Sequence, residues 1–134
     1  MGGGAGAGPF PKHEDLWDDY DESMHEIVTI LAAAIKNQKP VEFEYIQEDK
    51  PLGKRIGNPY AVFEGTRQDG TEKVYAHIVQ TAGVSDTIKL FPQWRMFFVD
   101  RISNIRVLED QPTFTIDEKY NPNWEPYSRA IAKI

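Results

Sequence analysis

Residues 41–45 read Val-Glu-Phe-Glu-Tyr, and this short stretch decides the fold class of the chain. Apolar and acidic side chains alternate strictly along it. Because successive side chains of a strand point to opposite faces of a sheet, the pattern predicts a half-buried β-strand. Val41, Phe43 and Tyr45 are expected on its buried face.

A helix is predicted just before this strand. Ser23 and Glu26 have the spacing of a capping box, in which each side chain accepts a hydrogen bond from the backbone N–H of the other residue. Apolar residues then recur at helical spacing and form one stripe, made of Met24, Ile27, Ile30, Leu31, Ala34 and Ile35. Asn37 and Pro40 mark its end, so we expect a helix of about 14 residues with one buried face.

Further strands are predicted after the first, separated by turn-forming residues. Four of them follow from apolar patterning, at residues 54–63, 72–80, 94–99 and 102–108. Residues 57–59, Gly-Asn-Pro, should bend or interrupt the second strand, because proline has no N–H for the ladder. Residues 69–70, Asp-Gly, predict a tight hairpin turn, and residues 81–93 a loop. A short strand and a last helical turn are possible at residues 113–116 and 128–133.

Five or six short antiparallel strands after one helix predict an α+β fold that is mainly β. We expect an N-terminal helix followed by a small β-barrel of the SH3 or Sm type, which closes on itself and leaves few exposed edges. A chain of 134 residues leaves little room for a second domain. We therefore expect a flexible Gly-rich and acidic arm at residues 1–22, one folded domain at 23–116, and a C-terminal tail at 117–134 with a possible short helix.

The charge of the chain is unevenly distributed. The net charge is −6, but residues 1–26 hold seven of the 21 acidic residues and one of the 15 basic residues. The remaining residues therefore carry equal numbers of both signs, and the excess negative charge lies in the leading segment. Such a segment is usually solvated, but its aromatic residues could instead pack on the body or on a partner.

Several classes of protein are disfavoured by composition. Cysteine is absent, which excludes disulfides, thiolate metal sites and a cysteine nucleophile. No apolar run approaches the roughly 18 residues of a membrane span, and the first residues show no secretory signal. We expect a cytoplasmic protein that does not associate with membranes.

Catalysis is poorly supported by the sequence. The three histidines, His13, His25 and His77, lack metal-ligand spacing. Ser85 lacks the second glycine of a nucleophile elbow, and Glu42 with Glu44 reads most simply as a solvated strand face. We expect no enzyme activity, no cofactor and no metal site.

Two segments resemble the motifs of WYL domains. The opening one is Val-x-Phe-x-Tyr at residues 41–45 after a helix ending in Ala-Ile, with Arg55 four residues before Pro-Tyr at 59–60. The closing one, residues 95–102, reads Arg-Met-Phe-Phe-Val-Asp-Arg-Ile and resembles the motif Arg-x-Phe-x-Leu-Asp-Arg-Ile. The resemblance covers residues 27–108 or so. The name-giving Trp-Tyr-Leu triplet falls on Val-Tyr-Ala at 74–76, so only its tyrosine matches.

The resemblance implies a fold similar to Sm-like barrels and a regulatory role. WYL domains are thought to sense nucleotides or single-stranded nucleic acid and to regulate an attached or associated protein. By position, the implied ligand contacts are Arg55, Tyr75, Arg95 and Arg101. The loop with Ser85 and the following Pro-x-Trp-Arg at 92–95 resembles short stand-alone bacterial proteins of this kind. We find no helix-turn-helix pattern in the leading segment and do not expect direct operator binding.

The same residues support binding on chemical grounds. Arginine pairs with phosphate in a bidentate fork and aromatic faces stack on bases. The three arginines and the nearby rings of Tyr45, Tyr75, His77 and Trp94 could supply both. The alternative is structural: the rings pack in the core, and the arginines pair with Glu42, Glu44 or Asp100. Strand parity places Arg95 and Trp94 on opposite faces, so we do not expect them to touch the same ligand.

Two functions from different classes remain open. The first is a module that binds a nucleotide or single-stranded nucleic acid, with binding that weakens as salt rises. The second is a protein-interaction adaptor that regulates a partner through the acidic aromatic arm or an open barrel edge. A combination is also open, in which the arm lies over the basic site and mimics the ligand.

Overall fold

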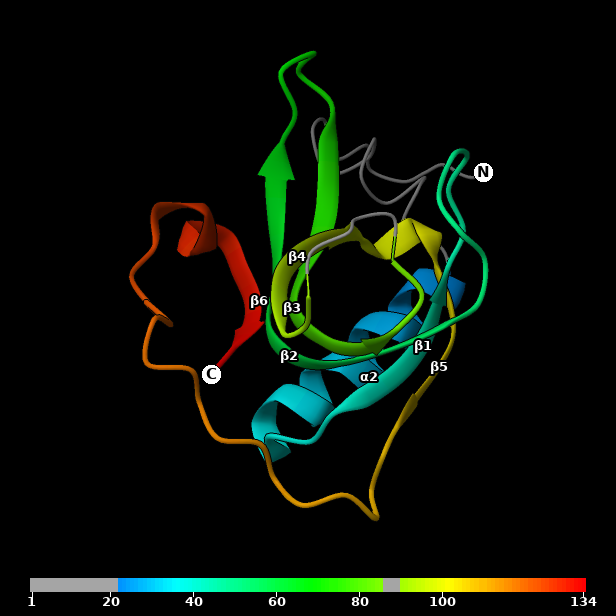
Figure 1. The fold of residues 1–134 in the computed structure, drawn as a ribbon. Helices are drawn as coiled ribbons and strands as arrows, with labels where there is room; N and C mark the ends of the chain where they lie inside the picture. The colour runs from blue at the N-terminus through cyan, green and yellow to red at the C-terminus, as the bar shows by residue number, and fades with distance from the viewer. Residues whose placement is uncertain (1–21, 86–89) are drawn as a thin grey trace.

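The computed structural model describes residues 22–85 and 90–134 (Figure 1). Within these ranges one helix, α2 (Glu22–Asn37), precedes the strands β1 (Val41–Tyr45), β2 (Lys54–Thr66), β3 (Glu72–Gly83), β4 (Gln93–Phe98), β5 (Ile102–Val107) and β6 (Ala130–Lys133). Two short 3-10 helices complete the described elements, η1 (Val99–Arg101) and η2 (Glu125–Arg129). The fold is therefore α+β and mainly β, as the sequence predicts.

Helix α2 buries one face against the sheet. Its apolar stripe is buried at Met24, Ile27, Val28, Leu31, Ala34 and Ile35. The expected capping box is wrong, because Glu22 is already helical and Ser23 lies inside the first turn. The helix ends where Gln38 adopts a φ of 52° and the N–H of Lys39 donates to the carbonyl of Ala34 at 2.9 Å. This left-handed residue turns the chain into β1.

The strands form one antiparallel sheet in the order β4-β3-β2-β1-β5, with β6 paired to β2. Strand β2 bends through two register shifts, between Ile56 and Gly57 and between Pro59 and Ala61. Gly57 allows a close approach there, since a Cβ atom would lie 2.6 Å from the Ile78 side chain. The predicted interruption is thus a bend within a continuous strand. Figure 1 shows β2, β3 and β4 curving strongly, with β6 on one side and β5 on the other.

Closure of the expected barrel is not seen. Strands β4 and β5 stand at the two ends of the strand order, and no pairing joins them within the described residues. The short helix η1 links them directly. The sheet is curved but open at this point.

The core lies between α2 and the curved sheet. Its centre is an aromatic group in which the Phe97 ring meets the rings of Phe43 and Tyr45 edge to face, at centroid distances of 5.1 and 4.8 Å. Phe43 and Tyr45 come from β1, on the face that strand alternation predicted to be buried. Edge-to-face packing fixes the position of β4 against β1, and this positioning creates the candidate site described below.

The C-terminal segment differs from its prediction. No strand forms at residues 113–116; instead the N–H of Phe114 donates to the carbonyl of Gln38 at 2.9 Å and ties the segment to the end of α2. The helical turn expected at residues 128–133 is wrong in position. Strand β6 forms there, directly after η2, and pairs with Ala61–Phe63 of β2. Strand β1 pairs only with the first part of β2, so β6 satisfies the backbone groups of that edge further along.

Within the described residues, no helix is long and apolar enough to cross a membrane. In the same ranges, no group of three or more His, Asp or Glu side chains could hold a metal ion.

Candidate functional site

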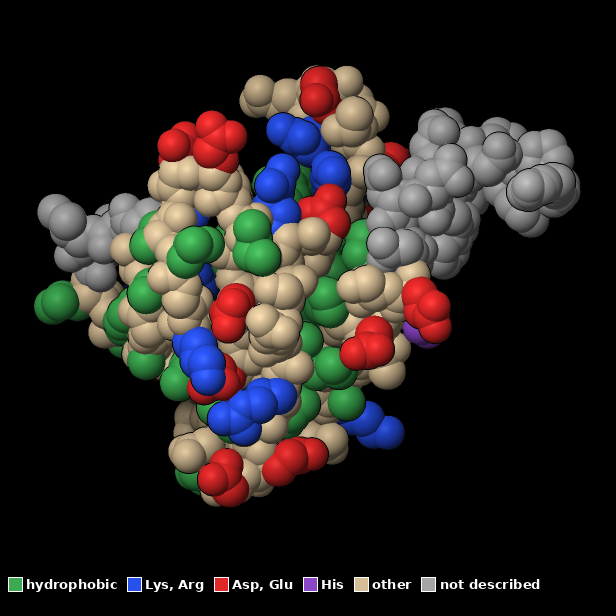
Figure 2. Space-filling view, turned by 90° about the vertical axis from the view of Figure 1, so that its right-hand side faces the viewer, with side chains coloured by type: hydrophobic (Ala, Val, Ile, Leu, Met, Phe, Trp, Pro, Cys, Tyr) green, Lys and Arg blue, Asp and Glu red, His purple; other side chains and the backbone are tan. Residues whose placement is uncertain are grey.

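A pocket of about 210 Å³ lies where the β1–β2 connection faces β4. We call it the basic pocket, and it is lined by Tyr45, Gln47, Lys50, Arg55, Arg95, Met96, Phe97 and Phe98. Of the residues predicted to bind a ligand, Tyr45, Arg55 and Arg95 meet here. The described lining holds three basic side chains and no carboxylate. Figure 2 shows Lys and Arg side chains gathered in the upper part of one face of the molecule.

Arg55 forms the buried floor of the basic pocket. Its side chain is 0% exposed, and its Nη1 donates to Gln80 Oε1 at 3.3 Å. The guanidinium lies over the rings of Tyr45 and Phe97, 5.7 and 5.6 Å from their centroids. A buried cation needs such partners, because leaving water costs it hydration. The sequence predicted Arg55 as a ligand contact, and its burial gives it a structural role as well.

Gln80 holds Arg55 in place and is itself fixed. Its Nε2 donates to the carbonyls of Ala82 and Val84, at 3.1 and 2.7 Å. Nearby, Gly83 has a φ of 98°, and a Cβ atom there would lie 2.2 Å from the carbonyl oxygen of Lys54. Only glycine allows β3 to approach β2 this closely beside Arg55.

Arg95 enters the basic pocket from β4. Its Nη1 donates to Ser85 Oγ at 2.9 Å and more weakly to Gln93 Oε1 at 3.5 Å. The guanidinium lies 5.8 Å from the centroid of the Phe97 ring. Ser85 thus orients an arginine. Arg95 is partly exposed and lines the pocket.

Tyr45 closes the inner wall of the basic pocket. Its hydroxyl oxygen accepts a hydrogen bond from the N–H of Phe98 at 3.0 Å. Burial raises the pKa of Tyr45, so the phenol stays protonated and neutral at physiological pH. Tyr45 therefore offers an apolar ring face rather than a charge.

Tyr75 and His77 lie on the other face of the sheet. Strand alternation places both on the face of β3 opposite to that of Ile78, the residue paired with Arg95. The Tyr75 ring stacks on Phe63 at 5.4 Å, and His77 Nδ1 lies 2.6 Å from the hydroxyl of Tyr127. Neither side chain lines the basic pocket.

The environment of His77 makes it a neutral group. Burial lowers the pKa of its imidazole to about 4. Burial likewise raises the pKa of Tyr127 above the usual range, so its hydroxyl stays protonated. The hydrogen bond between His77 and Tyr127 therefore joins a neutral imidazole to a neutral phenol.

Arg101 stands apart from the other predicted contacts. It is exposed in η1, and its backbone carbonyl accepts a hydrogen bond from the N–H of Ile46 at 2.9 Å. It does not line the basic pocket. Of the acids considered as arginine partners, Glu42 contacts Lys54 and Arg106, and Asp100 contacts Lys73.

A second pocket, of about 270 Å³, lies on the face that carries His77. We call it the aromatic pocket; its lining is His77, Trp94, Lys119, Tyr120, Asn121, Trp124 and Tyr127. Arg95 and Trp94 therefore line different pockets, as their strand parity predicts. Sequence reasoning missed the C-terminal rings. Three aromatic residues within positions 120–127 were the signal, since a solvated tail rarely carries so many.

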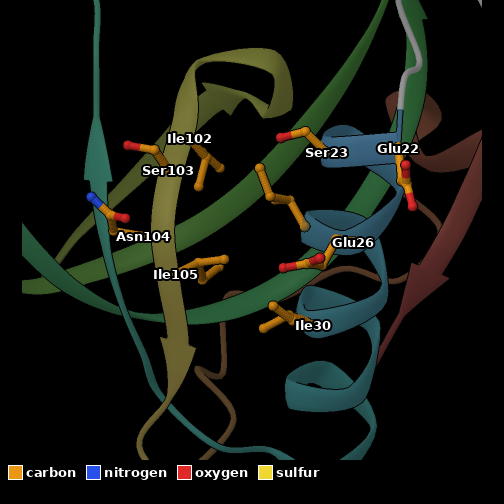
Figure 3. Close-up of a pocket in the computed structure, with 9 residues that line it drawn as sticks. Glu22, Ser23, Glu26, Ile30, Ile102, Ser103, Asn104 and Ile105 are labelled. Carbon is orange, nitrogen blue, oxygen red and sulfur yellow. The ribbon is translucent and has the colours of Figure 1, made fainter.

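A third hollow, of about 640 Å³, runs between α2 and β5. Figure 3 shows Glu26 and Ile30 of the helix pointing toward Ile105 of the strand. We call it the α2–β5 groove. The hydroxyl of Ser103, which also lines it, is buried and has no hydrogen-bond partner among the described residues. Asn104 follows with a φ of 51°, at the point where the pairing of β5 with β1 shifts register.

Comparison with protein-family models, with curated proteins and with solved structures finds no match to this chain in any of the three. The likeness to WYL domains therefore rests on the sequence motifs alone.

Proposed function

We propose that this chain is a sensing or regulatory module that binds the phosphate of a nucleotide or of single-stranded nucleic acid in the basic pocket. One observation carries the proposal: Arg55 and Arg95 come from β2 and β4, which are not neighbours in the sheet, yet they converge on one pocket with Lys50. The described lining adds no carboxylate to these three basic side chains.

The three basic residues would act differently on an anion. Arg95 is partly exposed and can pair with phosphate oxygens through its planar fork. Lys50 lies on the β1–β2 connection and supplies a point charge. Arg55 is buried and would raise the local positive potential from below. A pocket of about 210 Å³ suits a phosphate and part of a sugar, so the remaining ligand would extend over the surface.

We also propose kinship with WYL domains and hence with Sm-like barrels. The strand order supports it. The sheet runs β4-β3-β2-β1-β5, and a pairing between its two end strands, β4 and β5, would close it into a barrel. On this proposal the chain is a cytoplasmic, non-enzymatic regulator that acts through a partner protein.

A second candidate function is a protein-interaction adaptor. It is favoured by β5, which pairs with β1 on one side and borders the α2–β5 groove on the other. An extended segment of a partner could add to such an edge, with side chains entering the groove. An absence of polyanion binding by the folded chain would favour this candidate.

The proposal is tested by fluorescence anisotropy of labelled single-stranded DNA and RNA at low and moderate salt. The informative variant is Lys50→Ala/Arg95→Ala, because Arg55→Ala would also disturb the core. Lys36→Ala/Arg129→Ala removes the same charge from two exposed positions outside the pocket and serves as the control. We expect salt-sensitive binding by the wild type and the control, and at least tenfold weaker binding by the pocket variant. Equal affinities of the two variants would refute the site.

A further inference from the structure

The aromatic pocket is built from rings that surround a common space. The centroid of the His77 ring lies 4.8 Å from the centroid of the Trp94 ring and 5.3 Å from that of the Trp124 ring. The Trp124 ring meets that of Tyr127 at 5.2 Å and nearly at right angles. Trp124 is 39% exposed while Tyr127 is buried, so one tryptophan face stands at the rim and the inner rings form a wall.

Hydrogen bonds hold this wall in position. His77 Nδ1 and the Tyr127 hydroxyl are 2.6 Å apart, and the Tyr120 hydroxyl donates to the carbonyl of Ile134 at 2.8 Å. The pairing of β6 with β2 fixes the segment that carries these residues. The pocket is therefore preorganised, and a ligand would not need to order it.

The polar lining favours one kind of ligand over another. An aromatic cage can hold an organic cation, but Lys119 lines this pocket and the described lining includes no carboxylate. A cation would meet repulsion, whereas a neutral or anionic ring would not. Asn121 adds an amide that can both donate and accept hydrogen bonds at the edge of a ring. A volume of about 270 Å³ is small for a drug-sized molecule and suits one planar ring system.

We propose that the aromatic pocket is a second binding site, which takes the planar base of a purine or pyrimidine nucleoside against Trp124 and Trp94. Asn121 meets the edge of the base, and Lys119 stands where a negative group of a larger ligand would lie. The site does not rest on the phosphate-binding proposal, because a base stacks without any phosphate. It lies on the opposite face of β4 from Arg95.

The test is a titration of the full chain with adenosine, uridine and tetramethylammonium, followed through the indole N–H signals of the tryptophans by NMR. We expect the signals of Trp94 and Trp124 to shift and saturate together with a nucleoside. Trp124→Ala should weaken that binding at least tenfold, and Trp124→Phe should retain most of it, since stacking needs a ring face. Leu90→Ala, at an exposed apolar position, is the matched control and should bind as the wild type does.

Each outcome that would contradict this proposal can be told apart from a result that refutes phosphate binding in the basic pocket. Nucleosides that leave both indole signals unmoved, or that bind Trp124→Ala with wild-type affinity, would overturn the proposal. So would tetramethylammonium shifting these signals where adenosine does not, which would indicate a cation cage. Lys50→Ala/Arg95→Ala should bind adenosine unchanged; loss of that binding would place the base in the basic pocket and refute the second site.

Discussion

Arg55 and Arg95 share one aromatic ring: their guanidinium groups lie 5.6 and 5.8 Å from the centroid of Phe97. The two residues differ in burial, since Arg55 is wholly enclosed and Arg95 is partly exposed. Arg55 therefore belongs to the core as much as to the pocket, whereas Arg95 can approach a ligand. The separation of these roles leads to the first prediction.

Arg55→Ala should destabilise the fold. The substitution leaves a cavity beneath Phe97 and removes the donor to Gln80, so we expect a loss of about 2–4 kcal/mol in the free energy of unfolding. Urea denaturation followed by circular dichroism measures it. Arg95→Ala, the companion variant, should lose less than about 1 kcal/mol because its site is partly hydrated. Equal stability of Arg55→Ala and the wild type would contradict the structural role of Arg55.

Gly83→Ala should be costly, and Gly70→Ala much less so. Both glycines have positive φ, 98° and 89°, so both variants carry backbone strain of about 1 kcal/mol. At Gly83 a methyl group would also lie 2.2 Å from the Lys54 carbonyl oxygen, while at Gly70 it meets nothing within 4 Å. We expect Gly83→Ala to lose at least about 2 kcal/mol more than Gly70→Ala in thermal or urea unfolding. A smaller difference would mean that β2 and β3 do not approach closely beside Arg55.

The stability of the fold should decline in mild acid because of His77. Its pKa is lowered to about 4 by burial, so the unfolded chain binds this proton at a higher pH than the folded chain does. The associated stability is complete above the unfolded pKa of about 6.5 and is lost as the pH falls toward the folded value. Between pH 7 and 5.5 the loss should be about 1 kcal/mol.

The comparison that isolates His77 uses two glutamine variants. His77→Gln should show a shallower decline between pH 7 and 5.5 in urea unfolding, because the titrating group is gone. His25→Gln, on the exposed side of α2, should decline as steeply as the wild type. Parallel curves for all three proteins would show that another group controls the pH dependence.

Removal of residues 1–21 should strengthen polyanion binding. These residues lie outside the described part of the structure, and they carry five acidic residues with one lysine. An acidic segment on the same chain as a basic pocket can compete with an anionic ligand, because the covalent link raises its effective concentration. We expect the truncated chain to bind labelled single-stranded DNA several-fold more tightly at low salt, with a smaller gain at moderate salt. An unchanged affinity would exclude the arm as a ligand mimic.

Local pattern predicted the central elements of the fold well. Strand β1 begins and ends where the alternation at Val41–Tyr45 places it, because one face is buried and the other is half-exposed. Trp94 and Arg95 are successive residues of one strand, so side-chain alternation predicted that they point to opposite faces of the sheet. Sequence reasoning could not locate β6, which forms because β1 leaves part of the β2 edge unpaired. That edge is a property of the folded sheet and not of residues 130–133.

The candidate site was predictable only in part. Arg55 and Arg95 converge, but Tyr75 and His77 lie on the face of β3 opposite to that of Ile78, whose register partner is Arg95. That register becomes known only from the paired structure. Lys50 lies in a polar connection whose path no periodic pattern reveals, and its place in the pocket depends on the fold around it.

The central claim is that a phosphate group of single-stranded nucleic acid contacts Arg95 in the basic pocket. The most direct measurement follows the arginine Nε–H signals by NMR while a short single-stranded oligonucleotide is added to the full chain. We predict that the Arg95 signal shifts and saturates, while that of Arg129, which is paired with Glu72 at 3.1 Å outside the pocket, stays in place. A saturating titration that leaves the Arg95 signal unmoved, or an oligonucleotide that does not bind at all, would contradict the account.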